Sequence, residues 1–113
     1  PATLLWGDTL LQLYNDAYVE IARERHPALL GTPVAEGWSD IYDQAVAERL
    51  ATVRAGQAVS LTGREVAVRA ADGRFERRTF DIIWLPVRDA RGVVAGALPT
   101  MPSSAFSLSA YSG

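Results

Sequence analysis

The hydrophobic pattern changes its period at Gly56. Before this position, the clearest apolar stripe repeats every third or fourth residue, which is typical of one face of a helix. It predicts a helix over residues 40–55, begun by Ser39 or Asp40 and with this stripe: Tyr42, Val46, Leu50 and Val53. After Gly56, apolar and polar residues alternate, which is typical of strands. The chain therefore predicts a main helix followed by a sheet.

The N-terminal residues predict a hairpin and a short helix. Two apolar runs, Leu4–Trp6 and Leu10–Tyr14, flank a glycine-containing turn. Asn15-Asp16 supplies N-cap chemistry for a helix that His26-Pro27 ends, because proline disfavours helical geometry in the preceding residue. Residues 28–37 are expected to be irregular, with at most one helical turn.

Three more strands follow the main helix. Val59 and Leu61 alternate in one phase, whereas Val66 and Val68 alternate in the other, so Gly63 predicts a bulge between them. Turn chemistry at 72–73 and at 89–92 separates the later strands, the last of which is expected over 93–98. These turns predict antiparallel pairing.

The strand expected over 75–85 has two distinct faces. One face carries Phe80, Ile82 and Trp84, and the opposite face carries Asp81, Ile83 and Leu85. Pro86 is expected to close the pairing, since proline has no backbone N–H. Ile83 and Leu85 are large aliphatics on the face away from the helices, so we expect that face to be covered by a second copy of the chain or by a flanking helix.

The predicted fold is therefore α+β, a five-stranded antiparallel sheet with helices inserted between strands 2 and 3. The domain is expected to span residues 3–98, and the Pro- and Ser-rich residues 99–113 predict a linker or a disordered tail. A length of 113 residues suits one domain, and the first residue is Pro1, so we expect a piece of a longer protein.

Composition excludes several kinds of chemistry. The chain has no Cys and its 11 basic residues are all Arg, which excludes disulfides, thiolate nucleophiles, cysteinyl-flavin adducts and Schiff-base lysines within it. A net charge of -2 argues against a nucleic-acid-binding role. No apolar run approaches the roughly 20 residues of a membrane-spanning helix, and we expect a cytoplasmic location.

Four segments, in this order, resemble the PAS sensor domain. Residues 14–18 resemble the helix start of that family, and Leu30-Gly31-Thr32-Pro33 resembles its Gly-x-Pro connection. Residues 79–86 are similar to the fourth strand in bacterial sensor kinases, and residues 88–92 with Gly96 resemble the last turn and strand. The resemblance covers nearly all of residues 3–98. It implies a sensory module of a bacterial signalling protein of the sensor-histidine-kinase type, acting as a homodimer with flanking signalling domains.

One feature departs from the PAS pattern. The family usually continues from its last strand into a coiled coil, whereas here Pro99 and Pro102 follow Leu98. The route by which a signal leaves the domain is therefore left open.

If the domain binds a ligand, its cavity is expected where the helix stripe meets the inner sheet face. The candidate lining consists of aromatic and aliphatic residues: Tyr18, Trp38, Tyr42, Val46, Leu50, Phe80, Ile82 and Trp84. The pattern itself favours the plainer interpretation that these side chains fill the core, since bulky aromatics dominate the buried area of a small domain. The ligand itself is not identified by the sequence.

His26 and the arginines of the sheet give no second site. Haem-binding PAS members place a His on the main helix, which here has none, so we disfavour haem and expect His26 to face solvent or cap a helix. The arginines of residues 64–78 alternate with acidic residues, which predicts ion pairs on a solvated face. These basic residues are Arg64, Arg69, Arg74, Arg77 and Arg78.

Two other functions stay open beside the non-enzymatic sensory module. A cone-shaped α+β isomerase or dehydratase has a similar length, but that fold normally opens with a long helix and needs an acid–base set facing a deep pocket. This chain opens with a predicted hairpin and has a single His. The other alternative is a purely structural dimerisation domain with a filled core.

Overall fold

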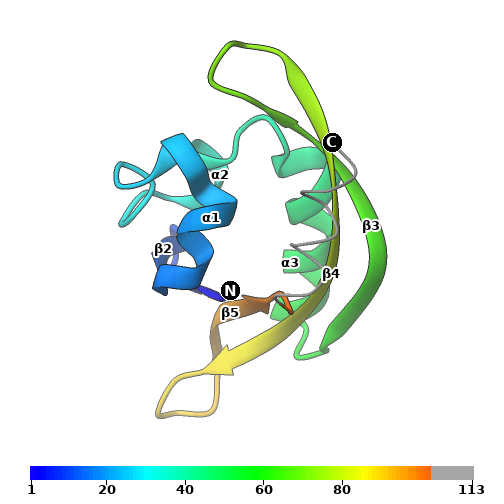
Figure 1. Cartoon of the computed structure of the whole chain (residues 1–113). Coiled ribbons are helices and arrows are strands. Elements are labelled where there is room, and N and C mark those ends of the chain that lie inside the picture. Colours follow the sequence, from blue (N-terminus) through cyan, green and yellow to red (C-terminus); the bar gives the residue numbers. More distant parts are fainter. Residues whose placement is uncertain (103–113) are drawn as a thin grey trace.

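A curved five-stranded antiparallel sheet, in the order β2-β1-β5-β4-β3, forms one side of the molecule (Figure 1). The computed structural model describes residues 1–102. The strands are β1 (Thr3–Trp6), β2 (Leu11–Tyr14), β3 (Val59–Arg69), β4 (Phe75–Arg88) and β5 (Val94–Thr100). All four neighbouring pairs are antiparallel, which confirms the predicted α+β class.

All the helical segments lie between β2 and β3 and cover the concave side of the sheet (Figure 1). They are η1 (Asp16–Tyr18), α1 (Val19–Ala22), η2 (Arg23–Arg25), α2 (Val34–Gly37), η3 (Tyr42–Val46) and α3 (Ala47–Arg54). Asn15 caps η1, because its side chain accepts the N–H of Tyr18, as predicted. No helix within residues 1–102 is long and apolar enough to cross a membrane.

The prediction of one continuous helix over residues 40–55 is wrong in its first half. A π turn, η3, precedes α3, and the N-terminus of η3 has no side-chain cap. Asp40, a predicted cap, directs its carboxylate elsewhere, to Arg25 and to the backbone N–H of Arg69. The carboxylate of Asp40, predicted to cap the helix, therefore makes a tertiary contact instead.

The bulge predicted at Gly63 is confirmed. The register of β3 against β4 shifts between Leu61 and Arg64, and Gly63 has a φ of 64°. Its backbone N–H donates to Asp81 Oδ1 at 2.7 Å. The bulge brings Leu61 and Arg64 onto the same face of the sheet, although three positions separate them.

Strands β4 and β5 both run further than predicted. Pro86 does not close β4, because it pairs with Ala97 of β5. β3 begins at Val59, opposite Trp84, and does not reach Pro86, so only one side of β4 is paired there and a missing N–H is tolerated. β5 continues to Thr100 and Met101 is buried, whereas residues 103–113 of the expected tail lie outside the described residues.

The core lies between the concave sheet face and the helical segments. β4 alternates as predicted, since Phe80 and Trp84 are buried while Ile83 and Leu85 are exposed. Buried side chains from α1, α2 and α3 complete this core: Ile21, Ala22, Val34, Leu50 and Val53.

Arg25 and Asp40 join the helical segments to the edge of the sheet. The guanidinium donates to both carboxylate oxygens of Asp40, at 2.8 and 2.7 Å, and to the carbonyls of Gly37 and Arg69. Asp40 also accepts the backbone N–H of Arg69 at 2.8 Å. The guanidinium carbon lies 4.2 Å from the ring centroid of Trp38. This planar, two-pronged pair fixes the position of Trp38 over the sheet.

The charge of Asp40 is favoured in the folded state. Burial opposes ionisation, but the hydrogen bonds from Arg25 and from the Arg69 N–H outweigh it and hold the pKa of Asp40 below its usual value. A carboxyl whose pKa is lower when folded stabilises the fold above its unfolded pKa of about 3.9, and this contribution is lost as pH falls through the folded pKa.

We expect Asp40→Asn to lower the free energy of unfolding by about 2 kcal/mol at pH 7, because charge-assisted hydrogen bonds are lost. The difference from wild type should shrink as pH falls below about 4, because Asp40 is protonated first in the unfolded chain and only at lower pH in the folded protein. Urea denaturation at several pH values measures both effects. Asp43→Asn is the control, since Asp43 is exposed in the same segment. An equal loss in both variants, or a difference independent of pH, would contradict the assignment.

Candidate ligand-binding cavity

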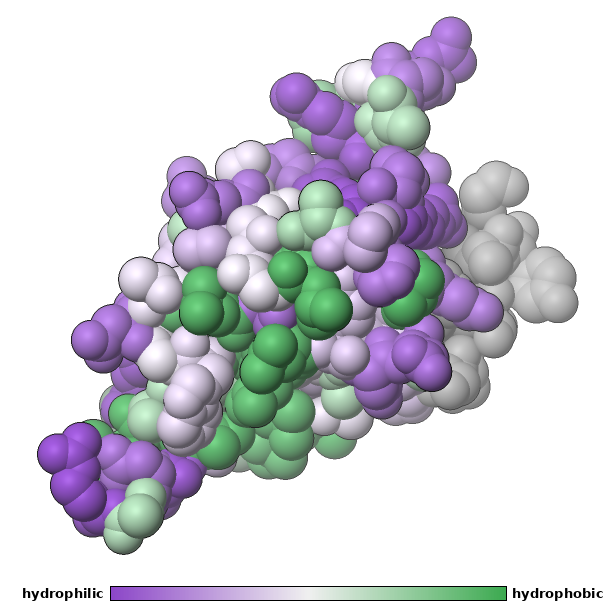
Figure 2. Space-filling model, turned by 90° about the vertical axis from the view of Figure 1, so that its left-hand side faces the viewer, coloured by the Kyte–Doolittle hydropathy of each residue, from purple (hydrophilic) through white to green (hydrophobic). Residues whose placement is uncertain are grey.

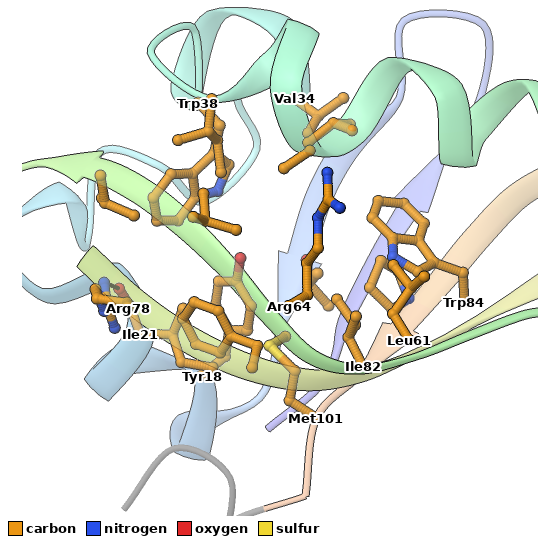
Figure 3. Close-up of a pocket in the computed structure, with 18 of the residues that line it drawn as sticks. Tyr18, Ile21, Val34, Trp38, Leu61, Arg64, Arg78, Ile82, Trp84 and Met101 are labelled. Atoms are coloured by element: carbon orange, nitrogen blue, oxygen red, sulfur yellow. Dashed lines mark hydrogen bonds between the residues drawn. The ribbon is translucent and has the colours of Figure 1, made fainter. Parts of the chain in front are cut away.

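A cavity of about 90 Å³ lies between the concave sheet face and the helical segments (Figure 3). Most of its wall is apolar, and it includes six of the eight residues predicted from sequence: Tyr18, Trp38, Val46, Phe80, Ile82 and Trp84. Tyr42 and Leu50 do not line it. The π turn changes which side chains of this segment face the sheet, so Ile41 and Ala45 line the cavity and Tyr42 packs at the edge of the core. Leu50 lines a separate hollow beside β5.

Arg64 lines the cavity although it was predicted on a solvated face. The bulge at Gly63 gives Arg64 the same inward phase as Val66. Figure 3 shows its side chain reaching into the cavity between Val34 and Trp84. The residue is also exposed to solvent, and its Nη2 donates to the carbonyl of Gln44 at 3.2 Å. Arg64 therefore stands at the mouth of the cavity.

Arg78 is buried, which corrects the prediction that all the sheet arginines face solvent. It has 4% exposure, donates to the carbonyl of Ile21 at 3.1 Å, and lies over the Phe80 ring. Burial, reinforced by the positive charge of Arg23, lowers the pKa of Arg78 to about 10. The burial of Arg78 could have been predicted from the alternation of β4, since Arg78 lies two residues before the buried Phe80 and therefore on the same face.

One of the predicted ion pairs between strands forms at exposed positions, where Arg77 of β4 pairs with Glu65 of β3 at 3.3 Å. Arg74 approaches Asp72 at 3.9 Å, but this contact is local to the turn between β3 and β4. Both arginines are largely exposed, so these pairs add little stability.

Gln12 is a second residue that the sequence pattern did not assign to the cavity. It is fully buried, and its amide oxygen accepts the indole N–H of Trp38 at 3.1 Å, while its amide nitrogen donates to the carbonyl of Thr32. Tyr18 lies nearby, and burial raises the pKa of its hydroxyl, so the phenol is neutral at ordinary pH. The polar atoms at this end of the cavity are thus held in fixed positions.

The indole N–H of Trp84, unlike that of Trp38, has no hydrogen-bond acceptor among residues 1–102. Its side chain lines the cavity with 4% exposure, and its indole Nε1 is buried with no hydrogen-bond partner within the described part of the chain. Buried N–H groups are paired in most proteins, so such a donor indicates a site for an acceptor.

His26 lies outside the cavity. Its Nδ1 is hydrogen-bonded to the hydroxyl of Tyr14 at 2.8 Å, and the side chain is partly buried. In residues 1–102, no group of three or more His, Cys, Asp or Glu side chains could hold a metal ion.

No protein-family model and no curated protein match the sequence. The fold is nevertheless similar to solved PAS and LOV domains. A fungal LOV-domain photoreceptor matches with a TM-score of 0.62 and 18% identity over 89% of this chain and 70% of that chain. VqmA of Vibrio cholerae, bound to DPO, matches with a TM-score of 0.61 and 18% identity over 90% of this chain and 52% of that chain. A PAS domain from Colwellia psychrerythraea matches with a TM-score of 0.60 and 13% identity over 89% of this chain and 84% of that chain.

These similarities show that the chain has a PAS/LOV fold. The chain spans only about half the length of VqmA. The similarities therefore establish the architecture of one domain.

The cavity does not fit the flavin bound in one branch of this fold. An engineered cavity of about 150 Å³ in another protein holds a single benzene ring. A cavity of about 90 Å³ is too small for the three fused rings of a flavin, and the chain has no Cys to form an adduct. Flavin chemistry therefore has no part in the function proposed below.

We expect Asp81→Ala to destabilise the protein by about 1 kcal/mol, because the Gly63 N–H loses its carboxylate acceptor at the bulge. Glu65→Ala is the control, since it removes only an exposed ion pair and should change stability by less than about 0.5 kcal/mol. Urea denaturation of both variants checks this. If Glu65→Ala costs as much as Asp81→Ala, the carboxylate of Asp81 does not hold the bulge.

Proposed function

We propose that this chain is a sensory module of a bacterial signalling protein, in which a small molecule in the cavity alters the geometry of a dimer. A sensor histidine kinase is the parent protein that the sequence favours, with its output in flanking domains. The observation that carries the proposal is a cavity in a PAS/LOV fold, lined by Trp84, whose buried N–H has no hydrogen-bond partner among residues 1–102.

The position of the cavity supports a signalling role. A molecule bound there contacts the helical segments through Ile41 and Ala45, and the sheet through Ile82 and Trp84. Any displacement of Trp84 acts on the same strand that carries Ile83 and Leu85 on its opposite face. A movement of Trp84 on the inner face would therefore be transmitted to its neighbours Ile83 and Leu85 on the outer face.

We also propose that the module is not an enzyme. Activation of a nucleophile needs a base held in hydrogen-bond reach. The single His of the chain is hydrogen-bonded to Tyr14 and does not line the cavity, so it is not placed to act as a base on a molecule bound there.

The convex face of the sheet supports self-association. It carries large apolar side chains, each 39–51% exposed: Trp6, Leu11, Leu13, Ile83 and Leu85. Strand alternation places them opposite the buried Leu5, Gln12 and Trp84. The side of the molecule that carries β2 is turned to the viewer in Figure 2, and apolar residues gather across its middle. A second copy of the same face would remove these side chains from water.

We expect Ala45→Leu to block the cavity, because Ala45 lines it and a larger side chain would occupy its volume. Xenon, which enters dry apolar cavities, is the probe. Under xenon pressure, the NMR resonances of the Ala45 amide and the Trp84 indole should shift in the wild type, and the Trp84 resonance should stay unchanged in Ala45→Leu. Ala51→Leu, at an exposed position of α3, should behave as the wild type. Absence of any shift in the wild type would remove the basis for ligand sensing.

We expect Ile83→Asp combined with Leu85→Asp to weaken dimerisation by at least about tenfold, since two charges would be buried at the interface. Sedimentation-velocity ultracentrifugation over a concentration series measures the dimer fraction. Gln57→Asp combined with Ala58→Asp, in an exposed loop, is the charge-matched control. A wild type that stays monomeric at high concentration, or a dimer that survives the first pair of changes, would show that this face is not the contact.

A further inference from the structure

The charged groups around the cavity are of one sign. Two arginines, Arg64 and Arg78, belong to its lining, and no Asp or Glu does among residues 1–102. The side-chain acceptor at the opposite end, Gln12 Oε1, already accepts from Trp38. The cavity therefore offers donors and positive charge to whatever enters it.

Trp84 lines the cavity and carries an indole donor at its wall. Its N–H is buried and has no protein acceptor in the part of the chain that the structure describes. Leaving such a group unpaired destabilises the protein, so an acceptor atom on a ligand would gain affinity from pairing with it.

Arg64 places a charged donor at the mouth. Its Nη2 hydrogen bond to the carbonyl of Gln44 leaves other N–H groups of the guanidinium for a ligand, and Figure 3 shows this group inside the cavity near Trp84. A guanidinium pairs best with a planar carboxylate, through two parallel hydrogen bonds. Because Arg64 is exposed on its outer side, its charge is only partly desolvated on binding.

The remaining wall restricts the size and polarity of the ligand. Val46, Phe80 and Ile82 form an apolar surface. By comparison with the six carbons of benzene in about 150 Å³, the volume of about 90 Å³ accommodates roughly four non-hydrogen atoms, which suits a short alkyl chain whose carboxylate oxygens lie beside Arg64 at the mouth. A polar or branched ligand of larger size does not suit this space.

We infer that the cavity binds a short-chain monocarboxylate, with its carboxylate between Arg64 and the Trp84 N–H and its alkyl tail against Val46, Phe80 and Ile82. This inference rests on the proposed sensory function and specifies its ligand class. Acetate, propionate and butyrate are the matching probes, and propionamide is the neutral analogue of nearly the same shape.

The test is a titration of the domain with each probe at constant ionic strength, followed by calorimetry and by the indole N–H resonance of Trp84. Propionate should bind and shift this resonance, and propionamide should bind about tenfold more weakly because it lacks the charge. Arg64→Gln should weaken propionate binding by about tenfold or more, with little effect on propionamide. Trp84→Phe should weaken both probes in calorimetry, since it removes the indole N–H together with part of the ring that lines the cavity.

Arg77→Gln is the matched control, because Arg77 lies on β4, is largely exposed and does not line the cavity. The inference is wrong if propionamide binds as tightly as propionate, or if Arg77→Gln has the same effect as Arg64→Gln. It is also wrong if xenon enters the wild type but none of the three carboxylates binds, and in that case ligand sensing in the cavity still stands. If xenon does not enter either, the proposed function fails together with the inference. Arg64 is exposed, so Arg64→Gln keeps the test valid even where Trp84→Phe does not fold.

Discussion

The paired hydrogen bonds between Arg25 and Asp40 connect three parts of the chain that are far apart in sequence. Arg25 is the last residue of η2, Asp40 precedes the π turn, and Arg69 is the last residue of β3. Within residues 1–102, no single helical element exceeds eight residues, so each depends on tertiary contacts for its stability. The pair supplies such a contact and positions Trp38, whose indole then fixes Gln12 at the far end of the cavity.

The cavity depends on a second constraint, the bulge at Gly63. Without the register shift, the residues after Leu61 would keep their phase, and Arg64 would face away from the helices. The bulge thus places one positive charge at the mouth of an otherwise apolar space. The same sheet is apolar on its convex face, so the cavity and this exposed apolar surface lie on opposite sides of one strand, β4.

Part of the cavity could be predicted from sequence and part could not. Phe80, Ile82 and Trp84 follow from strand alternation, and that alternation extends without change to Arg78, which was nevertheless assigned to solvent because of its charge. Tyr42 was assigned to the cavity from an ideal helical period, which the π turn breaks. Gln12 looked like a polar interruption in an apolar run, and only its partners, Trp38 and Thr32, explain its burial.

The sequence by itself determined the order of elements, the antiparallel pairing, the bulge and the two faces of β4. These features depend on local periodicity, turn residues and glycine geometry, which act between near neighbours. Tertiary structure alone decided that Asp40 binds Arg25 instead of capping a helix, that Arg78 is buried, and that the Trp84 N–H finds no acceptor in the described residues 1–102. Each of these depends on which distant groups compete for the same hydrogen bond or the same space, and no local pattern contains that information.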